Sequence, residues 1–586
     1  MPGNIEFLSL RSSGIKELPL SVWSNERISE FNIEDCKELE KLPSSTYNLK
    51  VSSTFSLDHC LSLGEFSEHP KDLSVLDLAR TSTKLLHISS MAHLFSLTTF
   101  KLKGCQKLES LPIGICNLKS LKELNLTGCS RFECFPVILD PMEHLEFLSL
   151  EETAIKELHS STEFLPVLET FQLKGCKRLE SLPTSICKLK CLVGINLSGC
   201  SRLEYFPEIL EPMEHLEFLC FKGTAVKKLP CSIDNLIGLQ TLDLHLCRNF
   251  EVVPSSIYNL KNLVTLNFDA CQELKELPSG TVSLISLEVL NLCRSSISEI
   301  PDSLVCSASL KDVNLSETLI RSIPACIKEA PRLSRLWLTN CKMLQSLPEL
   351  PVLVYLEAEG CTPLKTVSSS RTTLAQGWDK FCQEIINFFG CINLEHNARS
   401  NIMADAQLRI LGAASVSPKL REEKYDENSF RPLVTIVCLG HEIPNWFSNQ
   451  NDGSSIIINL PPNWFRNGFL GFALSVVVTY NDCWVRHGVE FGCKYKFITK
   501  NGESHEMISC SFYLGWYDSY FNPHHVFVTY NAFELEEDAK YSTDFYGLIT
   551  EASVRFRPMS LSCQPSSYLN WKSVVSACCM PKMPRN

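Results

Sequence analysis

The chain has 586 residues, a formal net charge of −11 at neutral pH, 28 cysteines and 44% hydrophobic residues. The mildly acidic balance argues against nucleic-acid binding as the main function, because nucleic-acid-binding faces concentrate lysine and arginine. The longest apolar run, Phe469 to Val478, is too short for a membrane span, and the N-terminus has no secretory-signal pattern. We therefore expect a cytoplasmic chain with reduced thiols, and leave a nuclear location open.

The stretch from Leu97 to Leu239 contains one segment twice. Residues 141–148 (PMEHLEFL) return at 212–219, about 71 residues later. Each copy divides into three coils of about 23–24 residues with the pattern Leu-x-x-Leu-x-Leu-x-x-Cys/Thr, which is typical of leucine-rich repeats. Apolar residues at the fourth and sixth positions share one face of a short strand, and only stacked neighbouring coils can bury that face. The pattern therefore predicts a solenoid.

The coils continue along the chain from Ile5 to about Val367. The pattern is degenerate over 51–68, and the last coil, which begins at Leu353, is shortened. We count about sixteen coils. Most of them close with a Leu-Pro or Ile-Pro pair, such as Leu182-Pro183, because proline lacks the N–H that a continuing strand needs. We expect each such pair to turn the chain onto the convex side.

Many cysteines occupy the ninth position of a coil, for example Cys105 and Cys129. A small buried donor fits this position, and a threonine hydroxyl, as at Thr153, can replace the thiol. The cysteines follow the coil period rather than a disulfide framework, and no Cys-x-x-Cys occurs, so a zinc site is not expected. The sequence predicts no metal and no cofactor.

The segment after the array changes character twice. Apolar residues lie at roughly helical spacing over Trp378–Phe389, and a second helix is expected over 401–411. From Arg431 the hydrophobic period becomes two, with turn residues between short strands and no intervening helices, which predicts an antiparallel sandwich. We expect the Trp464-Phe465 pair to pack inside it.

The predicted fold class is an α/β leucine-rich-repeat solenoid (a parallel β horseshoe) followed by an all-β jelly-roll or Ig-like sandwich. The predicted domains are the repeats over 1–367, a partly helical linker over 368–430, the sandwich over 431–558 and an irregular tail over 559–586.

Three groups of residues resemble one protein family. They are the Cys-x-x-Leu-x-x-Leu-Pro style of the coils, the segment Phe389–Leu394 (FGCINL), and the segments Gly440–Phe447 (GHEIPNWF) and Leu460–Trp464 (LPPNW). Together they are similar to the C-terminal part of plant disease-resistance proteins of the Toll/interleukin-receptor nucleotide-binding leucine-rich-repeat class. The resemblance implies a module that senses pathogen effectors and restrains a nucleotide-binding module. No Gly-x-x-x-x-Gly-Lys-Ser/Thr loop occurs, so nucleotide binding is not carried over.

Side chains at positions 3, 5 and 7 of each coil project from the concave sheet and are free to contact a partner. An exposed tryptophan beside an arginine and a tyrosine has the composition of an interface hot spot, although Trp337 and Tyr355 could instead stack on each other and cover the end of the array. The candidate partner-binding residues are Phe147, Phe218, Asp243, His245, Arg335, Trp337 and Tyr355.

The sequence predicts a non-catalytic recognition protein of plant innate immunity. It would sense pathogen effectors, or regulate a resistance protein, through the concave repeat face and the C-terminal β domain. The alternative is a general leucine-rich-repeat adaptor or scaffold that is not dedicated to pathogen sensing. A hydrolase built from Cys510, His505, His524 and His525 is a third and much weaker hypothesis, because nothing fixes their spacing. The expected partner is another protein, with no nucleic acid and no membrane span.

Overall fold

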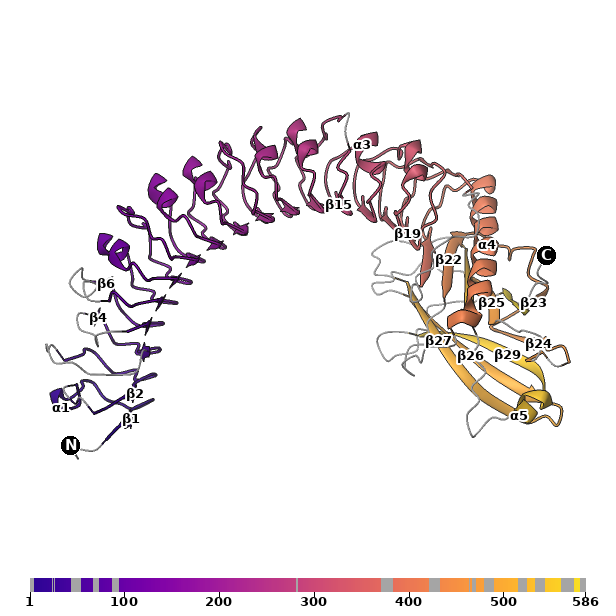
Figure 1. Cartoon of the computed structure of the whole chain (residues 1–586). Helices are drawn as coiled ribbons and strands as arrows, with labels where there is room; N and C mark the ends of the chain where they lie inside the picture. The colour runs from indigo at the N-terminus through magenta and orange to yellow at the C-terminus, as the bar shows by residue number, and fades with distance from the viewer. Residues whose placement is uncertain are drawn as a thin grey trace. The chain divides into compact units, whose positions relative to one another are not determined.

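A computed structural model of the whole chain describes most of the sequence (Figure 1). The described residues are 5–23, 25, 27–43, 54–66, 73–86, 94–280, 283–369, 383–420, 433–462, 464–465, 471–478, 489–514, 524–532, 543–559 and 574–579. The chain divides into two compact units, Met1–Ile297 and Ser298–Asn586, which are described separately. None of the described helices is both long and apolar enough to cross a membrane.

The first unit is a stack of coils, each of which contributes a three-residue strand to a parallel ladder (Figure 1). Neighbouring strands pair in register, so that Leu124 lies opposite Leu148, and Leu148 opposite Phe171. The strands are β1 (Phe7–Ser9), β2 (Glu30–Asn32), β3 (Thr54–Ser56), β5 (Val75–Asp77), β7 (Thr99–Lys101), β8 (Glu123–Asn125), β9 (Phe147–Ser149), β10 (Thr170–Gln172), β11 (Gly194–Asn196), β12 (Phe218–Cys220), β13 (Thr241–Asp243), β14 (Thr265–Asn267) and β15 (Val289–Asn291).

The opposite side of the same unit carries short turns. Five of these are single 3-10 turns, and three of the five directly follow an expected proline, as Ile113–Asn117 follows Pro112. The others are Ser160–Phe164, Thr184–Lys188, Ile233–Asn235 and Ser255–Asn259. The remaining elements are the short helix α1 (Leu20–Trp23) and the two-residue strands β4 (Glu65–Phe66) and β6 (Leu85–Leu86).

Side chains at two recurring polar positions of the coils make hydrogen bonds that stabilise the stack. The ninth-position thiols donate to a backbone oxygen of the preceding coil, as Cys129 Sγ does to the Leu102 oxygen at 3.1 Å. Thr153 Oγ1 donates instead within its own coil, to the Leu150 oxygen at 2.7 Å, which confirms the predicted hydroxyl substitution. At the strand ends, side chains such as that of Asn125 accept from the backbone N–H two residues later. These bonds satisfy polar groups that the turn would otherwise bury unpaired.

The second unit begins with three further coils of the same kind. Their strands are β16 (Asp312–Asn314), β17 (Arg335–Trp337) and β19 (Tyr355–Glu357), with the helix α3 (Asp302–Val305), a 3-10 turn over Ala325–Glu329, and the short strands β18 (Ser346–Leu347) and β20 (Thr366–Val367) between them. One cysteine pair departs from the expected reduced state, because Cys306 and Cys326 form a disulfide with 6.1 Å between their Cα atoms.

The expectation of a helix over Trp378–Phe389 was wrong for the part that is described. Glu384–Asn387 form the strand β21, which pairs parallel with β19. The reason is that this segment is another coil, in which Cys391 Sγ donates to the Ala358 oxygen at 3.1 Å, as the other ninth-position thiols do. The rest of that segment lies outside the described residues. The helix expected over 401–411 lies within α4 (His396–Leu420).

The repeat sheet of the second unit continues into the C-terminal domain without a break. The strand β22 (Val434–Leu439) pairs parallel with β21 on one side and antiparallel with β28 (His525–Ala532) on the other. The ladder then continues through β25 (Gly471–Val478), β30 (Val574–Cys579) and β23 (Asn449–Asp452). The parallel repeat strands and the antiparallel domain therefore share one hydrogen-bonded sheet.

A second antiparallel sheet packs against this first one. Its order is β24 (Ser455–Asn459), β29 (Ile549–Met559), β26 (Val489–Thr499) and β27 (Ser504–Leu514), and the helix α5 (Thr543–Leu548) precedes β29. Between the sheets, the Phe472 ring lies 5.3 Å from that of Tyr495, and Trp464 stacks on Phe497 at 5.9 Å. Trp464 is buried, as expected for a packing residue.

The expectation of an irregular tail after Pro558 was wrong for Val574–Cys579. These residues form β30, which lies between β25 and β23 and supplies hydrogen bonds to both. The segment is short and apolar and has no strict alternation, so periodicity could not identify it, whereas the open edge of the sheet accepts it through backbone hydrogen bonds.

Candidate functional site

Six of the seven candidate partner-binding residues lie on strands and His245 lies in the turn after β13, and the seven belong to two separate units. Phe147, Phe218, Asp243 and His245 belong to the first unit, and Arg335, Trp337 and Tyr355 to the second. In most strands the central residue is buried and its two neighbours are at least partly exposed, which places the neighbours on the concave side. The two groups are therefore described as two surfaces.

Asp243 and His245 belong to a hydrogen-bonded network in the first unit. Asp243 Oδ1 accepts from the Asn267 side chain at 2.9 Å and from the His245 backbone N–H at 2.9 Å. His245 Nδ1 lies 3.0 Å from Asp269 Oδ2, and Arg294 donates two bonds to the same carboxylate at 3.0 and 2.8 Å. These internal contacts satisfy the hydrogen bonding of both carboxylates, but among the described residues only Asp269 is neutralised by a cation, Arg294.

Phe147 and Phe218 do not form a joint aromatic patch. They hold the same coil position in the two copies of the duplicated segment, but β10 and β11 lie between their strands. Phe218 is 37% exposed and lies beside Gly194, where an added Cβ would meet the Phe218 ring at 3.6 Å. The missing side chain at Gly194 leaves Phe218 accessible from the neighbouring strand.

The three candidates in the second unit contact one another. Arg335 donates two hydrogen bonds of 2.6 Å to Asp312, and its guanidinium carbon lies 5.8 Å from the Trp337 ring centre. The rings of Trp337 and Tyr355 are 5.5 Å apart, tilted by 42°. Both aromatic side chains are half-buried. The stacking that was considered as an alternative to partner binding is therefore present, and one exposed face of the cluster remains.

Sequence reasoning missed a buried acidic pair beside this cluster. Tyr355 donates to Glu357 Oε2 at 2.8 Å, and the Asn387 amide donates to Glu357 Oε1 at 2.5 Å. Burial raises the pKa of Glu357 to about 7, and burial next to Glu357 raises the pKa of Glu359 to about 10. Glu359 is therefore protonated at neutral pH. In the sequence, this pair could have been recognised from two glutamates at positions 5 and 7 of the shortened coil.

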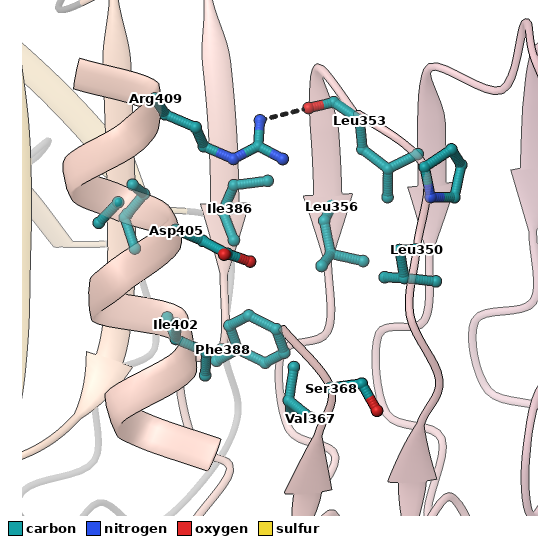
Figure 2. Close-up of a pocket in the computed structure, with 13 residues that line it drawn as sticks. Leu350, Leu353, Leu356, Val367, Ser368, Ile386, Phe388, Ile402, Asp405 and Arg409 are labelled. Carbon is teal, nitrogen blue, oxygen red and sulfur yellow. Dashed lines mark hydrogen bonds between the residues drawn. The ribbon is translucent and has the colours of Figure 1, made fainter. Parts of the chain in front are cut away.

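Helix α4 is anchored to the last coils by a buried ion pair. Arg409 Nη1 lies 3.0 Å from Glu384 Oε2 on β21 and donates to the Leu353 backbone oxygen at 2.6 Å (Figure 2). A cavity of about 30 Å³ lies beside this pair, and the apolar side chains of Leu356, Ile386 and Ile402 contribute to its lining. That volume holds about one water molecule, so it is too small for an organic ligand.

The structure does not assemble the hydrolase considered above from the side chains that it describes. His525 is fully buried, its Nε2 accepts from the Gly390 backbone N–H at 3.1 Å, and its ring stacks on Phe389 at 4.3 Å. His525 therefore joins the last coil to the C-terminal domain. His505 lies 4.0 Å from Glu503, and the Cys510 side chain is outside the described set. No cluster of three metal-ligating side chains occurs among the residues described.

The comparisons with known proteins agree with this architecture. A family model described as leucine-rich repeats of RPS4B-like disease resistance proteins matches residues 117–204 and 189–387, and a C-JID domain model matches 438–578. The repeat match ends at the last residue of β21, and the C-JID match includes most of β30. The chain is thus a leucine-rich-repeat protein with a C-JID domain after its repeats.

Curated relatives from Arabidopsis thaliana make the family more specific. The chain is 32% identical over 341 residues to the disease resistance-like protein DSC1, covering 58% of this chain and 26% of that protein. It is 30% identical over 403 residues to the disease resistance protein RPS4B, covering 68% of this chain and 27% of that protein. Among solved structures, the Leptospira interrogans leucine-rich-repeat protein LIC12759 gives a TM-score of 0.44 at 22% identity, covering 69% of this chain and 94% of that chain.

The chain is homologous to the C-terminal part of plant disease resistance proteins of the Toll/interleukin-receptor nucleotide-binding leucine-rich-repeat class, which confirms the predicted resemblance. It spans about a quarter of the length of DSC1 and of RPS4B.

Proposed function

We propose that the chain is a non-catalytic protein-recognition module of plant innate immunity. It binds a pathogen effector, or another resistance protein, through the strand side of its repeats and through the C-terminal β domain. Homology to plant disease resistance proteins in both the repeats and the C-JID domain supports the role in immunity. The cytoplasm, where effectors and resistance proteins meet, is the proposed location.

The observation that carries the proposal is the cluster of Arg335, Trp337 and Tyr355. Arginine, tryptophan and tyrosine are the residues most enriched in binding hot spots. The Arg335 guanidinium is held in place by Asp312 before any partner arrives, so little side-chain entropy is lost on binding. A pre-ordered aromatic surface of this kind suits a protein partner.

The shared sheet supports the participation of the C-terminal domain. Because β21 pairs with both β19 and β22, the last coils and the C-terminal domain are joined by backbone hydrogen bonds rather than by a flexible tether. This backbone pairing supports a recognition surface to which both the last coils and the C-terminal domain contribute.

Affinity capture with the whole tagged chain tests the proposal. Extracts of infected and uninfected plant tissue are compared by mass spectrometry, with Trp337→Ala as the matched variant. Effector or resistance-protein peptides that are enriched by the wild-type chain, and reduced by Trp337→Ala, support the proposal. Equal capture of the same housekeeping proteins from both tissues would favour the alternative, a general adaptor or scaffold.

A further inference from the structure

Two lysines of the first unit share one position in nearby coils and make no ion pair with any described residue, as is also true of Lys103 and Lys261. Lys174 and Lys222 hold position 7 of the coils that contain β10 and β12, and both side chains are exposed. Within the described part of the unit, neither ammonium group has a hydrogen-bond or ion-pair partner. Between their coils, the coil of β11 has Ser198 at the same position. These three residues lie at matching positions in the turns that directly follow the adjacent strands β10, β11 and β12.

Other lysines of the same unit are neutralised by the neighbouring coil. Lys156 Nζ lies 3.2 Å from Glu133, Lys190 Nζ lies 2.7 Å from Glu211, and the same cross-coil pairing occurs at Lys122, Lys188 and Lys227. Cross-coil ion pairing thus neutralises several lysines in this array, whereas others, such as Lys103 and Lys261, make no ion pair within the described part of the chain. The unpaired state of Lys174 and Lys222 leaves two cations on the concave side that a partner can neutralise.

These three strands, together with the turns that hold the lysines, contain no carboxylate. Residues 170–175 (TFQLKG), 194–199 (GINLSG) and 218–223 (FLCFKG) include two lysines and no aspartate or glutamate. The coils on either side are acidic, with Glu151 and Glu152 before them and Asp243 after them. A long polyanion such as a nucleic acid would meet repulsion on both sides, so the pattern selects a short acidic segment.

An apolar contact lies beside these lysine positions. The Phe218 ring is exposed on β12 next to Gly194, whose lack of a side chain opens space between β10 and β12. An incoming aliphatic or aromatic side chain can fill that space and contact the Phe218 ring. The position does not require glycine, because its φ is not in the left-handed region and an added Cβ would make only ordinary van der Waals contacts.

We propose that Lys174, Ser198, Lys222, Phe218 and Gly194 form a docking surface for a short acidic segment of a partner protein, which carries two carboxylates and an adjacent apolar side chain. Adjacent strands lie about 4.8 Å apart. The coils of Lys174 and Lys222 are separated by one coil, so the two lysines are roughly 10 Å apart. In an extended peptide every second side chain lies on the same face, about 7 Å apart, and the long lysine side chains can close the remaining few ångströms, so the segment has the form Asp-x-Asp with a flanking Leu or Phe. This inference deepens the recognition function proposed above and rests on it.

Fluorescence anisotropy with synthetic nine-residue peptides tests the proposal on the whole chain. The probe contains Asp-x-Asp and a flanking Phe, and its two controls carry Asn-x-Asn and Lys-x-Lys in the same frame. The Asp peptide is expected to bind at least about tenfold more tightly than either control, and to weaken as NaCl rises from 50 to 300 mM. Equal affinity for the Asp and Asn peptides would overturn the proposal.

Variants locate the surface. Lys174→Glu combined with Lys222→Glu is expected to weaken binding of the Asp peptide by roughly tenfold or more, since two exposed ion pairs become two repulsions. Lys261→Glu is the matched control, because Lys261 is also exposed and makes no ion pair. Gly194→Leu fills the space beside Phe218 and is expected to remove the preference for a flanking Phe. Unchanged peptide binding in both variants refutes the assignment.

A failure of this docking surface can be distinguished from a failure of the proposed recognition function. If the charge-reversed chain still captures an effector or resistance protein from infected tissue, while peptide binding shows no charge preference, recognition stands and this surface is wrong. If the wild-type chain captures nothing specific from infected tissue but binds the Asp peptide selectively, the surface stands and the immune role is wrong.

Discussion

The buried pair Glu357 and Glu359 predicts that the second unit loses stability as pH rises. Both carboxyls have a pKa in the folded state, about 7 and about 10, above the ordinary value of 4.5. The folded state therefore binds more protons than the unfolded state between pH 4.5 and those values. The free energy of unfolding falls through this window, by up to about 1.4 kcal/mol per pH unit for each proton.

Replacing Glu359 by glutamine removes most of this dependence. At pH 7 the folded chain keeps a proton on Glu359 that the unfolded chain releases. Holding this proton costs about 1.4 kcal/mol for each pH unit above the ordinary pKa of 4.5, which comes to roughly 3 kcal/mol at pH 7. Glutamine is neutral and keeps an amide donor toward Glu357. Glu359→Gln is therefore expected to raise the free energy of unfolding by about 2–3 kcal/mol at pH 7, and by almost nothing at pH 4.5.

Urea denaturation followed by tryptophan fluorescence at pH 5, 6, 7 and 8 measures the effect. Seven of the eight tryptophans, including Trp337, belong to the second unit, so the signal reports on the relevant part of the chain. Glu329→Gln, on the exposed turn Ala325–Glu329, is the matched control. A Glu359→Gln variant that is destabilised at pH 7, or that keeps the wild-type pH slope, would refute the argument.

Three further predictions concern packing and binding. Trp337→Ala is expected to weaken partner binding by more than about 1 kcal/mol while far-ultraviolet circular dichroism stays unchanged, and titration against an identified partner measures it. Arg409→Met leaves the buried Glu384 carboxylate without its cation and is expected to lower the urea midpoint by the equivalent of about 3–5 kcal/mol. Adding Glu384→Leu removes the unpaired carboxylate and is expected to restore most of the loss. No recovery of stability in the double variant would contradict this reasoning. Leu148→Ala, at a fully buried position, is expected to cost about 2–5 kcal/mol of stability, while Phe147→Ala next to it costs under about 1 kcal/mol, and equal thermal shifts for the two variants would contradict the predicted strand orientation.

The repeat fold could be predicted from sequence because each coil repeats the same pattern of buried leucines and polar turn residues. Leucines such as Leu124 and Leu126 recur at fixed spacing, and a thiol such as that of Cys129 donates to the coil before it. Every copy repeats the signal, so one degenerate coil does not hide it. The strand positions of six of the seven candidate binding residues, and the place of His245 in the turn after β13, follow from this periodicity.

The candidate surfaces were only partly predictable. The sequence placed Arg335, Trp337 and Tyr355 on the strand side, but their contacts depend on which side chain lies on the adjacent coil. Periodicity says nothing about pairing between coils, so it could not separate the satisfied Asp243 from the unpaired Lys174. For the same reason the sequence could not predict that Glu359 is protonated, because its protonation depends on burial and on a neighbouring carboxylate.

The sequence alone determined that the chain is a leucine-rich-repeat array followed by a strand-rich domain of the plant disease-resistance type. It did not determine where one ends and the other begins. Tertiary structure decided that, because β21 has the pattern of a coil and yet also pairs with β22 of the next domain. Backbone hydrogen bonds between strands carry no side-chain pattern, so a sheet can cross a domain boundary without leaving a mark in the sequence.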